Sequence, residues 1–215
     1  MLNNVWAWVW LLSVRFRPME VAGVTDEMPS RKVGPTYQLD ANRINAHQKD
    51  AYVNQLESWH DAGVIFLEMP SHAYEEAGRC NVERTEKASK YTWISTNDTI
   101  GGESEFRRKI ETIVFPRGAN SKGEKNDIWI LFTARQANAT LITADGASKT
   151  QPGGMLGNAP ALAELGIRVV SARAAVEEIK CSIQQRDQLA RRVSASTGIS
   201  LPHWVGQDDL ANAEL

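Results

Sequence analysis

The stretch that most constrains the fold is Thr140 to Gly146, where an apolar run ends in Thr-Ala-Asp-Gly. Such a run is typical of a buried β-strand that delivers a carboxylate, here Asp145, to a turn. The segment before it, from Asp127 to about Asn138, is predicted to be a helix that begins with a second carboxylate. A buried strand has no structural need to end in an acid, so both acids call for a chemical explanation.

Apolar runs and helical patterns alternate along the chain. Strands are predicted at residues 36–40, 64–69, 140–144 and 167–170, and helices at about 42–61, 71–77, 127–138, 158–166 and 172–190. In the second helix we expect Ser71 to be the cap. This alternation is typical of an α/β fold with a mainly parallel sheet and right-handed crossovers.

The length of 215 residues is enough for one domain with its own core. We expect this domain over residues 36–190, with a charged insertion over 78–125 that contains one short helix near 105–114. Residues 1–35 are interpreted as an apolar segment and a linker, and residues 191–215 as a loose tail. The apolar run Val5–Val14 is shorter than the ~20 residues that span a bilayer. Its positive charges follow it, so it does not match a secretory signal.

Charge and cysteine content exclude some classes of protein. The 24 Lys and Arg against 26 Asp and Glu give no global basic field for nucleic acid. Cys80 and Cys181 have no zinc-binding spacing, which favours a reduced, cytoplasmic location.

Element lengths predict where the acids meet. The helix from Asp127 rises about 17 Å at ~1.5 Å per residue, and the strand to Asp145 returns about 17 Å at ~3.3 Å per residue. Both acids should therefore lie at the carboxyl edge of the sheet, where Asp40 also ends its strand. With Ala73 at the centre of the buried stripe, Glu76 points inward and Glu75 points to solvent.

Four carboxylates, Asp40, Glu76, Asp127 and Asp145, are thus expected in one crevice, where open α/β sheets bind ligands. Two like charges about 4 Å apart repel by roughly 4 kcal/mol at an effective dielectric near 20. Such a cluster must bind cations or hold protons. An oxygen-only set favours Mg²⁺ or Mn²⁺, ions that activate water and assist phosphodiester hydrolysis.

Three of the four acids also have a purely structural interpretation. Asp127 could favour a helix N-terminus with Asn126 as cap, Asp145-Gly146 could be a turn, and Asp40 could be a cap. A surface position explains His72 more simply than a metal ligand does. The glycines around Gly153 lack the Gly-Lys-Ser/Thr ending of a P-loop.

The residues from about Tyr37 to Lys180 resemble a PIN domain, a family of metal-dependent nucleases that includes toxins of bacterial toxin–antitoxin pairs. Four ordered motifs carry the resemblance: Leu39-Asp40-Ala41-Asn42, Pro70 to Ala77 with Glu76, Asn126 to Ala134 with Asp127, and Thr140 to Gly146 with Thr143 and Asp145. The resemblance implies a three-layer α/β/α fold and cleavage of single-stranded RNA with Mg²⁺ or Mn²⁺. It also admits an antitoxin or other protein partner, and a homodimer.

Our leading hypothesis is a metal-dependent ribonuclease. Asp40, Asp127 and Asp145 would hold metal, Glu76 would complete the shell or orient water, and Asn42 or Thr143 would support them. The long connection between the second and third acids departs from compact toxins, as does the loop with Ser148 and Lys149, whose positive charge suits RNA backbone contact. Two alternatives stay open: a PIN-like module that binds RNA or protein without catalysis, and a phosphohydrolase on another α/β scaffold.

Overall fold

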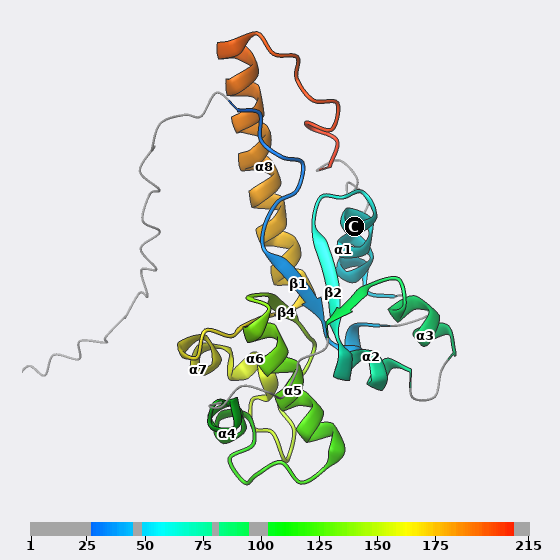
Figure 1. The fold of residues 1–215 in the computed structure, drawn as a ribbon, viewed down its shortest axis with the longest axis vertical. Coiled ribbons are helices and arrows are strands. Elements are labelled where there is room, and N and C mark those ends of the chain that lie inside the picture. Colours follow the sequence, from blue (N-terminus) through cyan, green and yellow to red (C-terminus); the bar gives the residue numbers. More distant parts are fainter. Residues whose placement is uncertain (1–26, 45–48, 79–81, 95–102, 209–215) are drawn as a thin grey trace, which may run out of the picture.

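A five-stranded parallel sheet is the centre of the fold in the computed structural model, which describes residues 27–44, 49–78, 82–94 and 103–208 (Figure 1). The strand order is β3 (Thr92–Ile94), β2 (Phe66–Pro70), β1 (Thr36–Leu39), β4 (Thr140–Ile142) and β5 (Arg168–Val170). All four pairings are parallel. The chain runs outward from β1 through β2 to β3, then returns to β4 on the other side of β1. The topological switch point therefore lies between β1 and β4.

Helices cover both faces of the sheet, so the fold is a three-layer α/β/α arrangement. One face carries α1 (Ala51–Asp61) and α8 (Ala172–Thr197), which pack against each other. The other carries α2 (Ser71–Ala77) and α5 (Lys122–Gln136), with α4 (Glu103–Val114) packed on α5. The remaining short helices are the 3-10 turn η1 (Ala41–Arg43), α3 (Val82–Ala88), α6 (Gly154–Gly157) and α7 (Ala159–Glu164).

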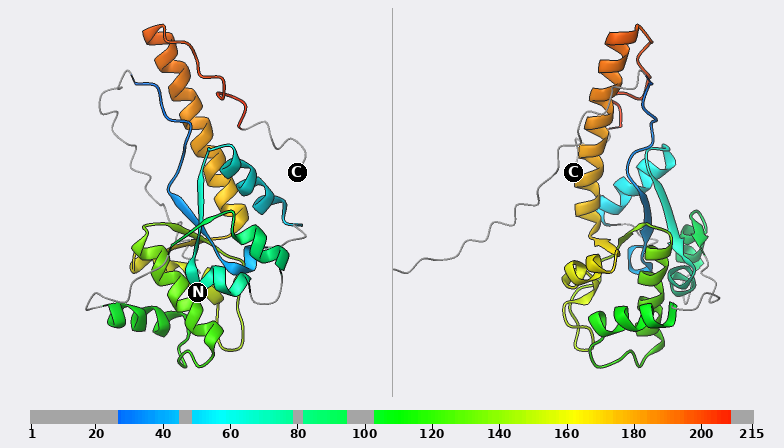
Figure 2. Two further views of the ribbon diagram at one scale, coloured as in Figure 1. Left: turned by 45° about the vertical axis from the view of Figure 1, so that its right-hand side comes forward. Right: turned by 60° about the vertical axis from the view of Figure 1, so that its left-hand side comes forward.

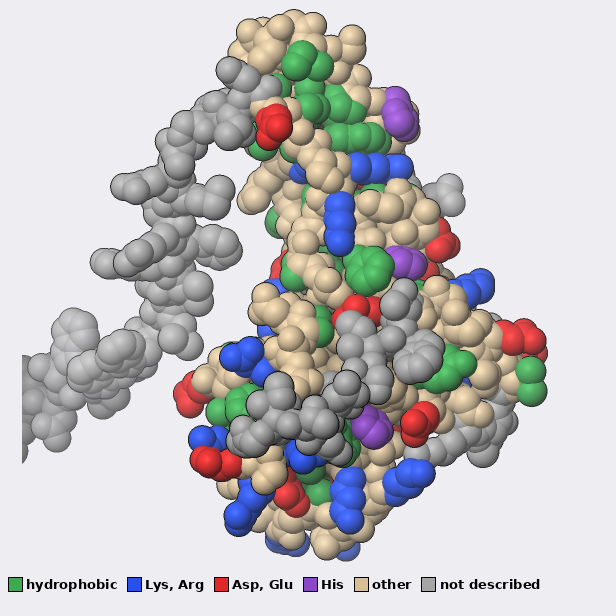
Figure 3. Space-filling model, viewed as in Figure 1, with side chains coloured by type: hydrophobic (Ala, Val, Ile, Leu, Met, Phe, Trp, Pro, Cys, Tyr) green, Lys and Arg blue, Asp and Glu red, His purple; other side chains and the backbone are tan. Residues whose placement is uncertain are grey.

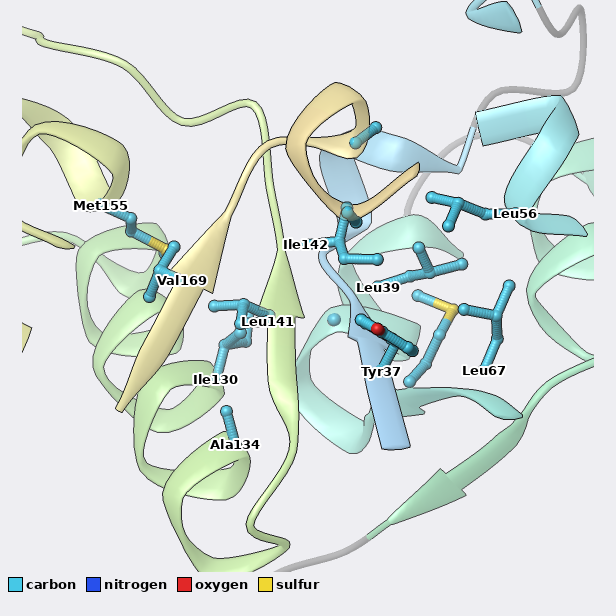
Figure 4. Close-up of a cluster of buried hydrophobic side chains, with 14 of the residues drawn as sticks. Tyr37, Leu39, Leu56, Leu67, Ile130, Ala134, Leu141, Ile142, Met155 and Val169 are labelled. Carbon is cyan, nitrogen blue, oxygen red and sulfur yellow. The ribbon is translucent and has the colours of Figure 1, made fainter. Parts of the chain in front are cut away.

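The core lies between these layers in two halves, one on each face of the sheet. Successive residues of a strand point to opposite faces and so contribute to different halves. Figure 4 shows Leu39 and Leu67 beside Leu56 of α1, whereas Leu141 lies beside Ile130 of α5. All five side chains are fully buried. The α/β class and the parallel sheet predicted from the sequence are confirmed.

Several predicted boundaries are wrong, for local reasons. The helix expected from residue 42 begins at Ala51, because Asp50 accepts hydrogen bonds from the backbone of Tyr52 and Val53 and caps it. Pro70, not Ser71, occupies the cap position of α2. The helix expected from Asp127 begins five residues earlier, at Lys122.

Residues 78–125, expected to be a charged insertion, contain regular elements of the main fold. The segment supplies α3, the edge strand β3, α4 and the first turn of α5. The short helix predicted near 105–114 is confirmed as part of α4.

The chain ends described by the structure pack onto α8, unlike the linker and loose tail expected from sequence. α8 continues to Thr197 and extends well beyond the sheet, and residues 199–208 return alongside it (Figure 2). The carboxylate of Asp208 accepts hydrogen bonds from Arg31 at 2.6 Å and from Arg186 at 3.0 Å. The backbone carbonyl of Asp208 accepts one from the indole of Trp59 at 3.0 Å.

Some sequence features fall outside the described residues, namely the apolar run 5–14, His47 and Cys80. Among the helices that are described, none is both long and apolar enough to cross a membrane.

Candidate active site

Two acids lie at the switch point of the sheet. Asp40 directly follows β1, and its backbone N–H donates to the carbonyl of Ile142, the last residue of β4, at 3.0 Å. Asp145 follows β4 by three residues. Neighbouring parallel strands thus bring both carboxylates to the edge where such sheets bind ligands.

Asp40 is held by two side-chain donors. Its Oδ2 accepts hydrogen bonds from the hydroxyl of Thr143 and from the amide of Asn42, each at 2.6 Å. Asn42 also accepts from the backbone N–H of Ala144 at 3.1 Å, which ties η1 to the end of β4. Asn42 and Thr143 thus lie beside Asp40 and fix the orientation of its carboxylate.

Asp145 is held by the short helix that follows it. Its Oδ2 accepts from the backbone N–H of Met155 at 2.9 Å, and its carbonyl accepts from Leu156 at 3.2 Å. Gly154 has a φ of +60°, and a Cβ there would lie 2.1 Å from the carbonyl oxygen of Gly146. Only glycine lets the loop return this closely to Asp145.

Asp127 lies in the second turn of α5, not at its start. Ser121 and Glu124 form a capping box that satisfies the first turn, so the purely structural interpretation of Asp127 as an N-terminal acid beside the cap Asn126 is wrong. The side chain of Asp127 makes no hydrogen bond or ion pair with any described residue.

Burial first, then the charges of Asp40, Asp145 and Glu76, raise the pKa of Asp127 to about 8. Because the charges of Asp40, Asp145 and Glu76 all act on Asp127, the four acids lie near one another.

The pKa values of Asp40 and Asp145 are also raised. Burial raises the pKa of Asp40 to about 6, the Thr143 hydrogen bond opposes this shift, and the charge of Glu76 adds to it. Burial also raises the pKa of Asp145, against the lowering effect of the Met155 N–H. No described Lys or Arg is among the main causes of these three pKa shifts. Burial and the repulsion between the acids dominate instead, so the protonated forms are favoured.

Glu76 lies near enough for its charge to raise the pKa values of Asp40 and Asp127. Ala73 and Ala77 of α2 are fully buried, Glu76 is half-buried and Glu75 is exposed. His72, one turn earlier, stacks on Trp129 of α5, with ring centroids 5.3 Å apart.

The four acids are neighbours but are not gathered around one point. Within the described part of the chain, no three His, Cys, Asp or Glu side chains are close enough to share a cation. Their chemistry nevertheless fits a hard divalent ion, because the donors are all carboxylate oxygens and their raised pKa values reflect uncompensated charge. A cation would relieve that repulsion. Asp40, Asp127 and Asp145 are the candidates to hold it, but in this structure no three of the described acids lie close enough to do so.

The loop after Asp145 contains one polar residue that the sequence did not indicate. Gln151 is buried, and its Nε2 lies near enough to Asp145 to lower its pKa, yet has no hydrogen-bond geometry with a described atom. Ser148 and Lys149 are exposed, and the Ser148 hydroxyl accepts from the Gln151 backbone at 3.1 Å. Gln151 gave no sequence signal, because a polar residue in a glycine-rich loop is ordinarily solvated.

Comparison with known proteins gives likenesses of structure but none of sequence. No protein-family profile and no curated protein matches the sequence. The fold is similar to a chain in the crystal structure of VapBC2 from Rickettsia felis bound to a DNA fragment from their promoter. The TM-score is 0.39 and the identity 17%, over 63% of this chain and 98% of that chain.

Proposed function

We propose that this protein is a Mg²⁺- or Mn²⁺-dependent ribonuclease that cleaves single-stranded RNA. The observation that carries the proposal is that Asp40 and Asp145 lie at the switch point of a parallel sheet, where their charges act on Asp127 and the charge of Glu76 acts on Asp40 and Asp127. Burial and mutual repulsion raise the pKa values of Asp40 and Asp127, and no described Lys or Arg is among the main causes of those shifts. Bound cations are the simplest source of compensating charge.

Each residue of the site has its own role in the proposed reaction. Asp40, Asp127 and Asp145 would hold the cation, which would supply activation of water and stabilisation of the charge at the phosphodiester. Thr143 and Asn42 fix the carboxylate of Asp40, and the Met155 N–H fixes that of Asp145. The half-buried Glu76 completes the shell or orients the attacking water.

The choice of RNA as substrate comes from the PIN-domain resemblance of the four motifs. The same resemblance supplies the partners, which are an antitoxin or another protein, or a second copy of this chain. The cytoplasmic location is inferred from the cysteines, which have no zinc-binding spacing. These assignments belong to the proposal and depend on the activity test below.

The test is cleavage of a labelled single-stranded RNA by the full chain with Mg²⁺, with Mn²⁺ and with EDTA. We expect cleavage only with metal, and a decrease by orders of magnitude in Asp40→Asn and Asp145→Asn. Asp61→Asn, an exposed change at the end of α1, is the matched control. Full activity in both site variants would overturn the proposal.

One observation favours a second candidate, a PIN-like module that binds RNA or protein without catalysis. The described acids are not already arranged as a metal cluster. This candidate predicts equal RNA binding with and without divalent metal, and no cleavage of any RNA tested. Calorimetric titration of the chain with Mn²⁺ separates the two, because only the ribonuclease requires a bound cation.

A further inference from the structure

One end of the molecule carries a concentration of positive charge that the overall composition hides. We name residues 104–125 and 146–153 the basic lobe; they comprise most of α4, the connection to α5, the first turn of α5 and the loop after β4. The lobe holds seven Lys and Arg but only three Glu, in a chain whose net charge is −2. Figure 3 shows Lys and Arg side chains along the lower end of the molecule, where Figure 1 places these elements.

The lobe is one continuous surface. α4 packs on α5. Backbone N–H groups of Ser121 and Asn120 hold the pKa of Glu124 below its usual range, and Thr150 from the loop after β4 contributes to the same shift. The loop that follows Asp145 therefore lies against the first turn of the helix that carries Asp127.

The three acids of the lobe are already engaged within it. Glu111 accepts from the backbone N–H of Ala119 at 2.8 Å. Glu124 accepts from Asn120 at 2.7 Å and from Ser121 at 2.8 Å. Glu105 pairs with Lys109 at 3.1 Å. These carboxylates serve capping and pairing, so they do not neutralise the remaining cations.

Four cations of the lobe are exposed and make no hydrogen bond or ion pair with the described residues. They are Arg108, Arg117, Lys125 and Lys149. Arg107 differs from these four, because its guanidinium packs on Trp129, 3.9 Å from the centre of the ring. Two of the four cations lie close in sequence to the acids, since Lys125 is two residues before Asp127 in α5 and Lys149 is four residues after Asp145.

We propose that the basic lobe binds the sugar–phosphate backbone of a single-stranded nucleic acid that leads into the acidic site, an inference that rests on the proposed ribonuclease function. A polyanion approaching four carboxylates is repelled, and neighbouring positive charge offsets that repulsion. The four cations come from α4, the connection to α5, the first turn of α5 and the loop after β4. Cations distributed in this way match a strand of several phosphates better than a single anion. Phosphate contacts of this kind position the strand without selecting its sequence.

Binding is measured by fluorescence anisotropy of a short labelled single-stranded RNA on the full chain in EDTA, so that cleavage cannot interfere. For single strands the slope of log K against log salt is about −0.7 for each phosphate neutralised. Each of Arg108→Gln, Arg117→Gln, Lys125→Gln and Lys149→Gln should reduce the slope by about 0.7 and weaken binding roughly three- to five-fold at physiological salt. Arg192→Gln, an exposed change near the distal end of α8, is the matched control.

Two results would overturn the inference. One is an unchanged affinity and salt slope in all four lobe variants, or an equal loss in Arg192→Gln. The other is competition by a polyglutamate peptide of equal charge as effective as competition by RNA, which would indicate an acidic protein partner. Failure of the ribonuclease proposal is distinguishable, because it would appear as absent metal-dependent cleavage while lobe-dependent binding in EDTA persists.

Discussion

At the scale of a single residue, Asp127 is a candidate metal ligand whose ionisation also affects the stability of the fold. Its pKa is raised to about 8 in the folded protein, first by burial and then by Asp40, Asp145 and Glu76, whereas the unfolded value is near 3.8. The folded state thus binds this proton more tightly than the unfolded state does. Stability from the protonated carboxyl is fully present below about pH 4 and is lost as pH rises through about 8.

We therefore expect Asp127→Asn to abolish cleavage and yet stabilise the metal-free protein. At pH 8 the gain in the free energy of unfolding should be on the order of 1–3 kcal/mol, because asparagine does not ionise in the crowded site. At pH 4 the two proteins should be nearly equal. Urea unfolding in EDTA at both pH values measures the difference.

The exposed change Glu164→Gln controls for a general effect of charge and should leave stability unaltered at both pH values. A lower stability of Asp127→Asn at pH 8 would show that the Asp127 carboxylate is stabilised in the fold, contrary to the raised pKa.

Thr143 tests whether the orientation of Asp40 matters. Thr143→Val removes the hydroxyl that donates to Asp40 Oδ2 at 2.6 Å and leaves a buried carboxylate with one donor fewer. We expect about 1–2 kcal/mol lower stability and about 10–100-fold slower cleavage, the usual effect of removing a partner that orients a metal-ligating group. Steady-state cleavage rates at saturating Mn²⁺ and urea unfolding measure the two effects.

Thr133→Val is the matched control for Thr143→Val. Thr133 is equally buried, but its hydroxyl donates to the carbonyl of Trp129 in its own helix. Its replacement should leave the cleavage rate within a few-fold of wild type. Equal rate losses in the two variants would mean that packing, not the orientation of Asp40, explains the effect.

At the scale of elements, the turn from β4 to α6 decides where Asp145 lies. A Cβ at Gly154 would be 2.1 Å from the carbonyl oxygen of Gly146 and 2.8 Å from that of Asp145, so Gly154→Ala must push the two segments apart. We expect the Met155–Asp145 hydrogen bond to be lost, with stability lower by about 1–3 kcal/mol and cleavage strongly reduced.

Gly157→Ala, three residues later, meets nothing within 4 Å and serves as the control. It should keep wild-type activity and, at the end of a helix, have a small effect on stability. Thermal unfolding and RNA cleavage of the two variants side by side check the prediction. Wild-type activity in Gly154→Ala would show that the close return of this loop is unnecessary.

The acids at strand ends could be predicted from sequence because their signal is local. Asp40 and Asp145 each end an apolar run, and the parallel order of the strands then places them at one edge. Glu76 followed from helical spacing. The start of α5 was missed because Ser121 and Glu124, its capping box, lie in a stretch whose charges conceal any apolar period.

Two other features, β3 and the position of Gln151, could not be predicted from the sequence for physical reasons. β3 has three residues, too few to show the alternation of a strand, and it exists because it pairs with β2. Gln151 enters the site only because Gly153 and Gly154, both at positive φ, fold the loop back onto Asp145.

At the scale of the whole molecule, contacts between distant segments were the least predictable. The sequence from Ser194 is polar and suggested a loose tail, whereas Trp204 is buried against the guanidinium of Arg186, 4.3 Å from its ring centre. Asp208 lies 177 residues from its partner Arg31. No local pattern encodes such a pairing, since it depends on how far α8 extends past the sheet.

This pairing gives a prediction for stability that is independent of catalysis. Asp208 accepts from Arg31 and Arg186, and all but the Arg31 side chain are almost fully buried. Asp208→Ala leaves the buried Arg186 with Asp187 as its one carboxylate partner among the described residues. Removing one member of a buried ion pair costs about 3–5 kcal/mol.

Urea unfolding of Asp208→Ala should show that loss, with Glu164→Ala, an exposed acid, as the control that changes little. The network ties residues 27–33 and 199–208 to α8, away from the acidic site at the carboxyl edge of the sheet (Figure 1). RNA cleavage by the folded variant at low temperature should therefore equal that of wild type. A cleavage defect without a stability defect would place Asp208 in the working site, which the geometry of the network contradicts.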